Sequence, residues 1–210
     1  MMLVRNLLSF SPVYRAFQDL MGGNARRDYV QTYLKPEPGM RVLDVGCGPG
    51  DILRYLDPSI DYTGVDLSAA YIAHARKHFG ERGRFLNESV SDLAVREPAS
   101  FDRVTANGLF HHLNDAEAVH LLDIAKQALK PEGCFVSIDP CYEPGQSAIA
   151  RYLINKDRGN HVRRRAEYVA LARSAFPNVS YEIRHDLTRV PYTHLIMMCP
   201  QDEAVVRKAG

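Results

Sequence analysis

Three glycines lie within five residues of the chain, at positions 46, 48 and 50, directly after an apolar run that begins at Val42. Glycine adopts positive φ without strain and lets a ligand approach the backbone closely, because it has no Cβ. Asp44 precedes this loop and Asp51 follows it. Two carboxylates suit a ligand that carries cationic groups and disfavour a pyrophosphate. Residues 42–51 therefore predict a ligand-binding loop between a buried strand and a helix.

The spacing of the glycines separates this loop from two other nucleotide-binding loops. A dinucleotide fingerprint, G-x-G-x-x-G, would place its third glycine at the position of Asp51. A triphosphate-binding loop would need a Lys followed by Ser or Thr, and this sequence has no such pair after the glycines. An NAD(P)-dependent oxidoreductase stays open as an alternative, because it would share the fold type and an acidic residue for the ribose.

Further side chains that could do chemistry stand where strands are expected to end. Asp66 lies twenty residues after Gly46, and a carboxylate there can accept hydrogen bonds from both ribose hydroxyls. Asn107 falls at the edge where open α/β sheets bind their ligands. His111 and His112 follow it, and an imidazole can accept the proton of an acceptor hydroxyl. Neighbouring residues cannot both face one site in regular structure, so one of the two histidines is expected to be structural.

The elements that must position these residues follow from hydrophobic periodicity, caps and turn residues. Strands and helices are expected to alternate, which predicts an α/β domain with a mostly parallel sheet. The short connection between the last two strands predicts that they are antiparallel. Strands are expected over residues 42–45, 62–67, 84–90, 101–107, 134–140, 179–187 and 193–199, and helices over residues 11–21, 25–34, 52–56, 68–79, 114–129, 146–154 and 165–176.

Residues 42–51 resemble the first motif of the class I S-adenosylmethionine-dependent methyltransferases, hydrophobic-Leu-Asp-hydrophobic-Gly-Cys-Gly-x-Gly. Residues 101–113 and the Leu-Lys-Pro-x-Gly turn at 129–133 resemble the same family, and the resemblance extends over about residues 40–140. It implies a three-layer, Rossmann-like methyltransferase fold whose seven-stranded, mostly parallel sheet ends in an antiparallel C-terminal hairpin. It also implies S-adenosyl-L-methionine as the cofactor and methyl transfer as the reaction.

The resemblance also assigns roles to individual residues. His111 and His112 become candidates for a catalytic base. Ser89 departs from the family pattern, because many relatives carry an acidic residue there that holds the adenine amino group. Tyr14 belongs to N-terminal helices that often fold over the cofactor in this family. The expected cofactor-binding residues are Asp44, Gly46, Cys47, Gly48, Asp66, Leu67, Ser89, Val90 and Asn107, and the expected acceptor-site residues are Tyr14, Tyr142, Tyr152 and His161.

The length of 210 residues favours one domain with four parts. These are an N-terminal helical cap at 1–38, a cofactor-binding core at 39–140, an acceptor-site insertion at 141–163, and a helix with the terminal hairpin at 164–210. Residues 141–163 are irregular and follow the fifth strand, where loops on a rigid scaffold commonly carry function. We expect this part to decide which molecule accepts the methyl group.

The composition of the chain limits the classes of binding partner that we expect. The chain has 26 Lys and Arg against 25 Asp and Glu, so no global field favours nucleic acid or an anionic membrane. Arg163, Arg164 and Arg165 form the local basic cluster, which we expect to be a solvated helix start. Contact with a phosphate or carboxylate of a substrate, or with a nucleic-acid backbone, stays open as the alternative. The four cysteines form no C-x-x-C pair and no third ligand joins His74 and His78, so no metal site is expected.

The sequence lacks a membrane-length apolar run and a convincing signal sequence, so we expect a cytoplasmic protein. Its acceptor is expected to be a small polar molecule that is methylated on oxygen or nitrogen. Besides the oxidoreductase, a non-catalytic relative that binds the cofactor or a partner protein stays open. The sequence does not decide the oligomeric state.

Overall fold

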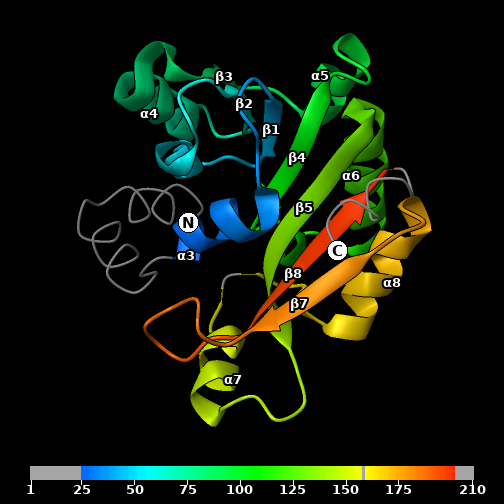
Figure 1. The fold of residues 1–210 in the computed structure, drawn as a ribbon. Helices are drawn as coiled ribbons and strands as arrows, with labels where there is room; N and C mark the ends of the chain where they lie inside the picture. The colour runs from blue at the N-terminus through cyan, green and yellow to red at the C-terminus, as the bar shows by residue number, and fades with distance from the viewer. Residues whose placement is uncertain (1–24, 158, 202–210) are drawn as a thin grey trace.

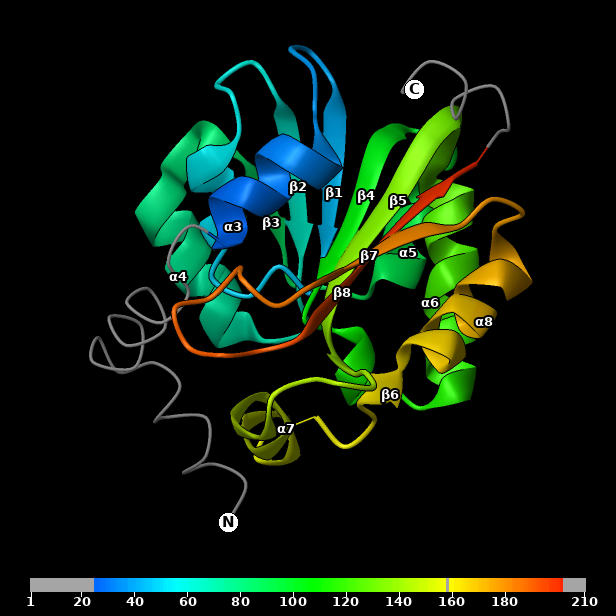
Figure 2. The ribbon, with the colours of Figure 1, turned by 60° about the horizontal axis from the view of Figure 1, so that its bottom comes forward.

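A computed structural model of the protein describes residues 25–157 and 159–201 (Figure 1). The helix expected at 11–21 and the acceptor-site candidate Tyr14 lie outside the described residues. The described chain forms one central sheet with helices on both faces (Figures 1 and 2). In chain order the elements are α3 (Ala25–Asp28), η1 (Tyr29–Leu34), β1 (Arg41–Val45), η2 (Asp51–Tyr55), β2 (Asp61–Val65), α4 (Ala69–Phe79), η3 (Gly80–Arg82), β3 (Arg84–Leu86), α5 (Val90–Arg96), β4 (Phe101–Asn107), η4 (Phe110–His112), α6 (Asp115–Ala128), β5 (Leu129–Tyr142), α7 (Ala148–Asn155), β6 (Arg163–Arg164), α8 (Arg165–Ala175), β7 (Ser180–Arg184) and β8 (His194–Pro200).

The sheet has the order β3-β2-β1-β4-β5-β8-β7. Strands β1 to β5 pair in parallel, whereas β8 runs antiparallel to both β5 and β7. The α/β class and the antiparallel terminal hairpin are thus confirmed. The predicted count of seven strands is wrong, because β6 adds an eighth strand that pairs with the end of β5. The strand order reverses between β1 and β4, and this reversal is where an open α/β sheet binds its ligand.

Two hydrophobic cores, one on each face of the sheet, hold the layers together. Successive strand residues alternate between them: Leu43 packs with α5, α6 and α8, whereas Val42 packs with η1, η2 and α4. The same alternation separates Phe135 from Val136 on β5. Side chains on a strand point to opposite faces with a period of two, so strands covered on both faces are apolar at nearly every position.

The third strand is shorter than expected, and the prediction of a strand over 84–90 is wrong beyond Leu86. Helix α5 begins at Val90, because the hydroxyl of Ser89, the residue before it, accepts a hydrogen bond from the backbone N–H of Asp92 at 3.2 Å. A serine in this position satisfies a backbone donor that the first helical turn leaves free. The sequence carried the signal, a serine followed three residues later by an acid, at Ser89 and Asp92.

Other helix boundaries follow the sequence more closely. Ser68 caps α4, and Asn114 forms a capping box with Glu117 at the start of α6. The helix expected at 25–34 is present, although its second half, η1, has π-helical hydrogen bonding and ends at a left-handed Lys35. None of the helices in the described part of the chain is both long enough and apolar enough to cross a membrane.

Candidate active site

The glycine loop connects β1 to η2 at the carboxyl edge of the sheet. Gly46, Gly48 and Gly50 have φ angles of +67°, +54° and +79°, in the left-handed region that glycine favours. The backbone N–H of Gly46 and that of Cys47 donate to the carbonyl oxygen of Val65 on β2, at 2.9 and 3.1 Å. A Cβ at Gly50 would lie 2.7 Å from the Phe85 ring. The loop is therefore fixed to the neighbouring strands and accepts no larger residue at this position.

A cavity of about 240 Å³ opens beside the glycine loop. It brings together the glycine loop, Asp44 and Asn107, which the sequence predicts, and five residues that the sequence does not predict as part of the site, among them Arg26, Tyr29 and Ile138. Its lining consists of Ala25, Arg26, Tyr29, Asp44, Gly46, Cys47, Gly48, Pro49, Asp51, Ile52, Asn107 and Ile138.

Tyr29 fixes the first turn of η1 against the sheet. Its hydroxyl donates to the carbonyl oxygen of Val136 at 2.9 Å and lies 2.6 Å from the hydroxyl oxygen of Thr105. Burial raises the pKa of Tyr29 well above its ordinary value, although the hydrogen bond to Thr105 opposes this shift. The phenol is therefore neutral and serves as one wall of the cavity. Its sequence signal was only an apolar helix face, which predicts core packing equally well.

Asp44 is the most constrained polar residue of the cavity, with 2% of its surface exposed. The Tyr62 hydroxyl donates to Oδ2 of Asp44 at 2.8 Å. Oδ1 is buried and has no hydrogen-bond partner among the described residues. Burial raises the pKa of Asp44 to about 7, and the negative charge of Asp66 adds to this shift. A buried acceptor without a donor is costly, so this oxygen fits a ligand that brings a donor or a cation.

Asp66 follows β2 directly; it does not itself line the cavity but supports the glycine loop beside it. Its Oδ2 accepts a hydrogen bond from the backbone N–H of Gly48 at 2.9 Å, and its Oδ1 accepts one from Ser68 at 2.7 Å. Each carboxylate oxygen has two acceptor sites, so both oxygens can still accept a ribose hydroxyl. The two backbone contacts fix the direction in which Asp66 presents these sites.

Leu67, Ser89 and Val90, which the resemblance had assigned to the cofactor, do not line the cavity. The Leu67 side chain is 78% exposed. The Ser89 hydroxyl is engaged in the helix cap and donates to Oδ2 of Asp92 at 2.8 Å. The roles of these three residues stay predictions.

His111 and His112 stand on η4 in different environments. His111 is buried, and its Nδ1 lies 2.8 Å from Oδ1 of Asp139 while its Nε2 lies 3.3 Å from Oδ1 of Asp157. Burial alone would lower the pKa of His111, but the hydrogen bonds to Asp139 and Asp157 outweigh it and raise the pKa to about 9. In contrast, burial and the neighbouring His111 lower the pKa of His112. At neutral pH His111 is therefore an imidazolium, whereas His112 is uncharged.

The acceptor-site candidates after β5 lie apart from the cavity lining. The Tyr142 hydroxyl donates to Oδ1 of Asn155 at 2.7 Å, which ties the end of β5 to α7. Tyr152 is 62% exposed on α7, with the Lys156 ammonium group 5.9 Å from its ring centroid. His161 is exposed, and its backbone N–H donates to the carbonyl oxygen of His111 at 2.9 Å. Their roles as substrate contacts stay predictions.

The expectation of a solvated helix start is wrong for Arg163, which is only 7% exposed. Its guanidinium group donates to the carbonyl oxygens of Phe110 and Leu113 at 3.0 and 2.6 Å, and to Oδ1 of Asp115 at 2.8 Å. Planar guanidinium groups suit several acceptors at once. The buried arginine thus holds the η4 turn against β6, and no part of it is available to an external phosphate.

Three comparisons with known proteins agree with this geometry. The sequence profile of a family described as a methyltransferase domain matches residues 42–133. A ubiquinone biosynthesis O-methyltransferase of Xanthomonas euvesicatoria pv. vesicatoria is 37% identical over 112 residues, which cover 51% of this chain and 46% of that protein. A ubiquinone biosynthesis O-methyltransferase of Idiomarina loihiensis is 34% identical over 112 residues, which cover 51% of this chain and 45% of that protein. The chain thus matches less than half the length of these curated relatives.

Solved structures share the fold over most of the chain. The geranyl diphosphate C-methyltransferase of Streptomyces coelicolor A3(2), solved with S-adenosyl-L-homocysteine, has a TM-score of 0.65 and 16% sequence identity, covering 85% of this chain and 76% of that one. The sheet order and the glycine loop at its switch point define a class I, Rossmann-like methyltransferase fold. Residues 42–133 match the methyltransferase domain family, and the fold is shared with solved S-adenosylmethionine-dependent methyltransferases. The cofactor of this family is S-adenosyl-L-methionine.

Proposed function

We propose that the protein transfers the methyl group of S-adenosyl-L-methionine to a hydroxyl oxygen of a small polar acceptor. The observation that carries this proposal is the buried, unpartnered Oδ1 of Asp44 beside a glycine loop that Asp66 holds in place. The cofactor carries an ammonium and a sulfonium group, and both are cations that a carboxylate favours. The relatives named for O-methylation support oxygen over nitrogen as the acceptor atom.

The residues of the chain have separable tasks in this reaction. Asp44 and Asp51 hold negative charge at the cavity, and Asp66 accepts hydrogen bonds from the ribose hydroxyls. The bound cofactor supplies an electrophilic methyl group on sulfur. Fixing the acceptor oxygen in line with this group supplies much of the rate, because positioning replaces a bimolecular encounter. His112, which has no hydrogen bond at its ring nitrogens within the described residues, is available to accept the hydroxyl proton.

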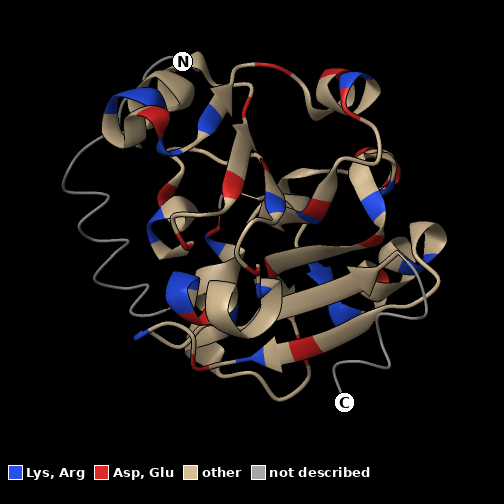
Figure 3. Ribbon diagram, turned by 45° about the horizontal axis from the view of Figure 1, so that its top comes forward, with Lys and Arg blue, Asp and Glu red and all other residues tan. Residues whose placement is uncertain are grey.

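The coarse organisation expected from the sequence remains part of this proposal. Residues 39–140 form the cofactor-binding core and residues 141–163 the acceptor side, with 1–38 as the cap and 164–210 completing the domain. Lys and Arg are interspersed with Asp and Glu over the described elements (Figure 3). This mixture supports a small-molecule partner over nucleic acid, and the cytoplasm remains the proposed location.

The test measures binding and transfer separately. Calorimetry of the full chain should give tighter binding of S-adenosylhomocysteine than of NADH. Incubation with S-adenosylmethionine labelled in its methyl group should then label 3,4-dihydroxybenzoate, chosen as a soluble probe with two hydroxyls, or another hydroxylated metabolite of a lysate. Tighter binding of NADH would support the oxidoreductase instead. Binding of S-adenosylhomocysteine without transfer to any acceptor would show a non-catalytic relative.

A further inference from the structure

We propose that His111 is a positioning residue, whose ring joins Asp139 to Asp157 and thereby fixes Asp157 and residues 159–161 as the acceptor-side wall of the active site. This inference rests on the proposed function, and it assigns the segment after α7 a defined place relative to the cofactor-binding edge. It also gives the two neighbouring histidines different roles, because, of these two residues, His112 is the one that can accept a proton.

Both nitrogens of the His111 ring are engaged by carboxylates from different parts of the chain. Asp139 comes from β5, and its Oδ1 accepts from Nδ1 at 2.8 Å and from the backbone N–H of His111 at 3.2 Å. Asp157 follows α7, and its Oδ1 lies 3.3 Å from Nε2. The Tyr192 hydroxyl, from the connection between β7 and β8, donates to the other oxygen of Asp157 at 2.9 Å. The chain Asp139–His111–Asp157–Tyr192 therefore links four separate segments, and we refer to it as the imidazolium chain.

The backbone around His111 is packed as closely as its ring. The N–H of Gly159 donates to Oδ1 of Asp157 at 2.9 Å, and the N–H of His161 donates to the carbonyl oxygen of His111 at 2.9 Å. A Cβ at Gly159 would lie 2.5 Å from that carbonyl oxygen, so the segment accepts only glycine where it crosses η4. Arg163 holds the carbonyl oxygens of Phe110 and His161 from the other side. Asp157 and residues 159–163 are thus bound to η4 through contacts at Asp157, His161 and Arg163.

These contacts exclude His111 as the proton acceptor. An imidazole accepts a proton only through a nitrogen that has a free lone pair, and both nitrogens of His111 already face carboxylate oxygens. A protonated ring can donate to one oxygen of each carboxylate at once. The arrangement is therefore suited to holding two segments together.

The charge of His111 depends on every group that faces it. Asp139 from β5 and Asp157 after α7 favour the imidazolium, the adjacent His112 on η4 opposes it when protonated, and Tyr192 acts through Asp157. Because the pKa of His111 in the folded protein is raised above that of an unfolded chain, its stabilising contribution is complete below about pH 6.5. The contribution is lost as the pH rises through about 9. The acceptor-side wall should loosen over the same interval.

The experiment compares Asp157→Asn with wild type in the full chain. Replacement of one carboxylate should raise the KM for 3,4-dihydroxybenzoate about tenfold, the loss typical of one hydrogen bond to a charged group. The affinity for S-adenosylhomocysteine should stay within about twofold, because Asp157 does not line the cofactor cavity. Hydrogen exchange at the amides of Gly159 and His161, corrected for the intrinsic effect of pH, should accelerate about tenfold in Asp157→Asn.

Measuring the KM for the acceptor over a series of pH values distinguishes the proposed role from a general loss of stability. In wild type the KM for the acceptor should rise between pH 8 and pH 10, and in Asp157→Asn this rise should begin at lower pH, because the His111 imidazolium has lost one carboxylate. Tyr192→Phe should give a smaller change in the same direction. Asp61→Asn is the matched control, since it removes an exposed carboxylate at the opposite edge of the sheet, and it should leave the KM and the exchange of both amides unchanged.

Two results would overturn the inference. One is unchanged amide exchange in Asp157→Asn, and the other is accelerated exchange with an unchanged KM, which would make the imidazolium chain purely structural. If wild type binds S-adenosylhomocysteine but methylates nothing, the proposed function alone fails. Hydrogen exchange at the amides of Gly159 and His161 then still decides whether the imidazolium chain fixes the segment that contains these two residues.

Discussion

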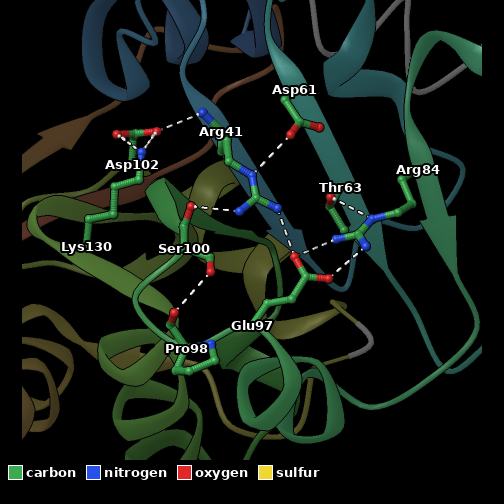
Figure 4. A network of polar contacts seen from close by, with 9 residues as sticks. All are labelled: Arg41, Asp61, Thr63, Arg84, Glu97, Pro98, Ser100, Asp102 and Lys130. Carbon is green, nitrogen blue, oxygen red and sulfur yellow. Dashed lines mark hydrogen bonds and ion pairs between the residues drawn. The ribbon is translucent and has the colours of Figure 1, made fainter.

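The carboxylates at the two edges of the sheet differ in their partners. At the amino edge, Arg41 donates to Glu97 at 2.8 Å and to Asp61 at 3.1 Å, and Glu97 also pairs with Arg84 (Figure 4). Lys130 on β5 completes this network through a bond to Asp102 at 2.8 Å. At the carboxyl edge, Asp44 and Asp139 each keep one buried carboxylate oxygen without a partner among the described residues.

The pKa values express the same contrast. Asp102 is partly buried, which raises its pKa, but Lys130 and the backbone N–H of Arg41 outweigh this and hold the pKa below its usual range. Asp44 has one hydroxyl donor instead of cations, and burial raises its pKa to about 7. Asp44, which has no compensating cation among the described residues, therefore marks the edge at which we propose that the ligand binds, whereas the compensated carboxylates of the other edge stabilise the fold.

The largest expected effect comes from Asp44→Asn. The affinity for S-adenosylhomocysteine should fall about 10- to 100-fold in calorimetry, because the amide removes the charge that pairs with the ligand's ammonium group. The same variant should melt at a higher temperature than wild type at pH 8. Its folded state no longer carries a buried carboxylate that has to ionise above pH 7.

Asp102→Asn serves as the matched variant at the amino edge. It should lower the melting temperature and leave the affinity for S-adenosylhomocysteine within about twofold of wild type, since Asp102 is distant from the cavity in the sheet. Equal losses of affinity in Asp44→Asn and Asp102→Asn would contradict the division between the two edges.

An intermediate effect is expected from pH. A bound cation favours the ionised form of Asp44, whose pKa before binding is about 7. Affinity for S-adenosylhomocysteine should therefore rise about tenfold between pH 6 and pH 8, with uptake of the ligand releasing a proton at the lower pH. Calorimetry in two buffers of different ionisation enthalpy measures that proton. A pH-independent affinity would show that Asp44 does not contact the charged part of the ligand.

The smallest effect is expected at Glu97, in the amino-edge network. Its carboxylate accepts from Arg41 and Arg84, and these contacts hold its pKa below the usual range. Because the pairs are partly exposed, Glu97→Gln should cost about 1 kcal/mol and lower the melting temperature by about 2–4 °C. Added salt should reduce the difference between Glu97→Gln and wild type. A change in ligand affinity in this variant would show that the two edges are coupled.

The part of the site that the sequence predicted is local in the chain. The glycine loop and Asp44 lie within one run of ten residues, and Asp66 and Asn107 follow at strand ends, so their spacing alone brings them to one edge. The α/β class and the antiparallel hairpin are likewise confirmed, because strand and helix periods are local properties.

The part that the sequence did not predict depends on contacts between distant residues. In the sequence, Tyr29 is one apolar position of a predicted helix. Its hydrogen bond to the carbonyl oxygen of Val136, 107 positions away, is visible only in the structure. Arg163 reads as a surface arginine, yet its partners are carbonyl oxygens about fifty positions earlier in the chain. Backbone acceptors have no signature in sequence, because every residue carries one.

The length of β5 has a consequence for protein engineering. The strand continues without a break from Leu129 to Tyr142, so it pairs with β4 and β8 inside the sheet and with β6 beyond its edge. In the proposed organisation, residues before Pro140 belong to the cofactor-binding core, and those after it lead into the segment that we propose the imidazolium chain fixes. The end of β5 is thus a junction at which a chimaera can exchange the acceptor side of the enzyme while retaining the loop that binds its methyl donor.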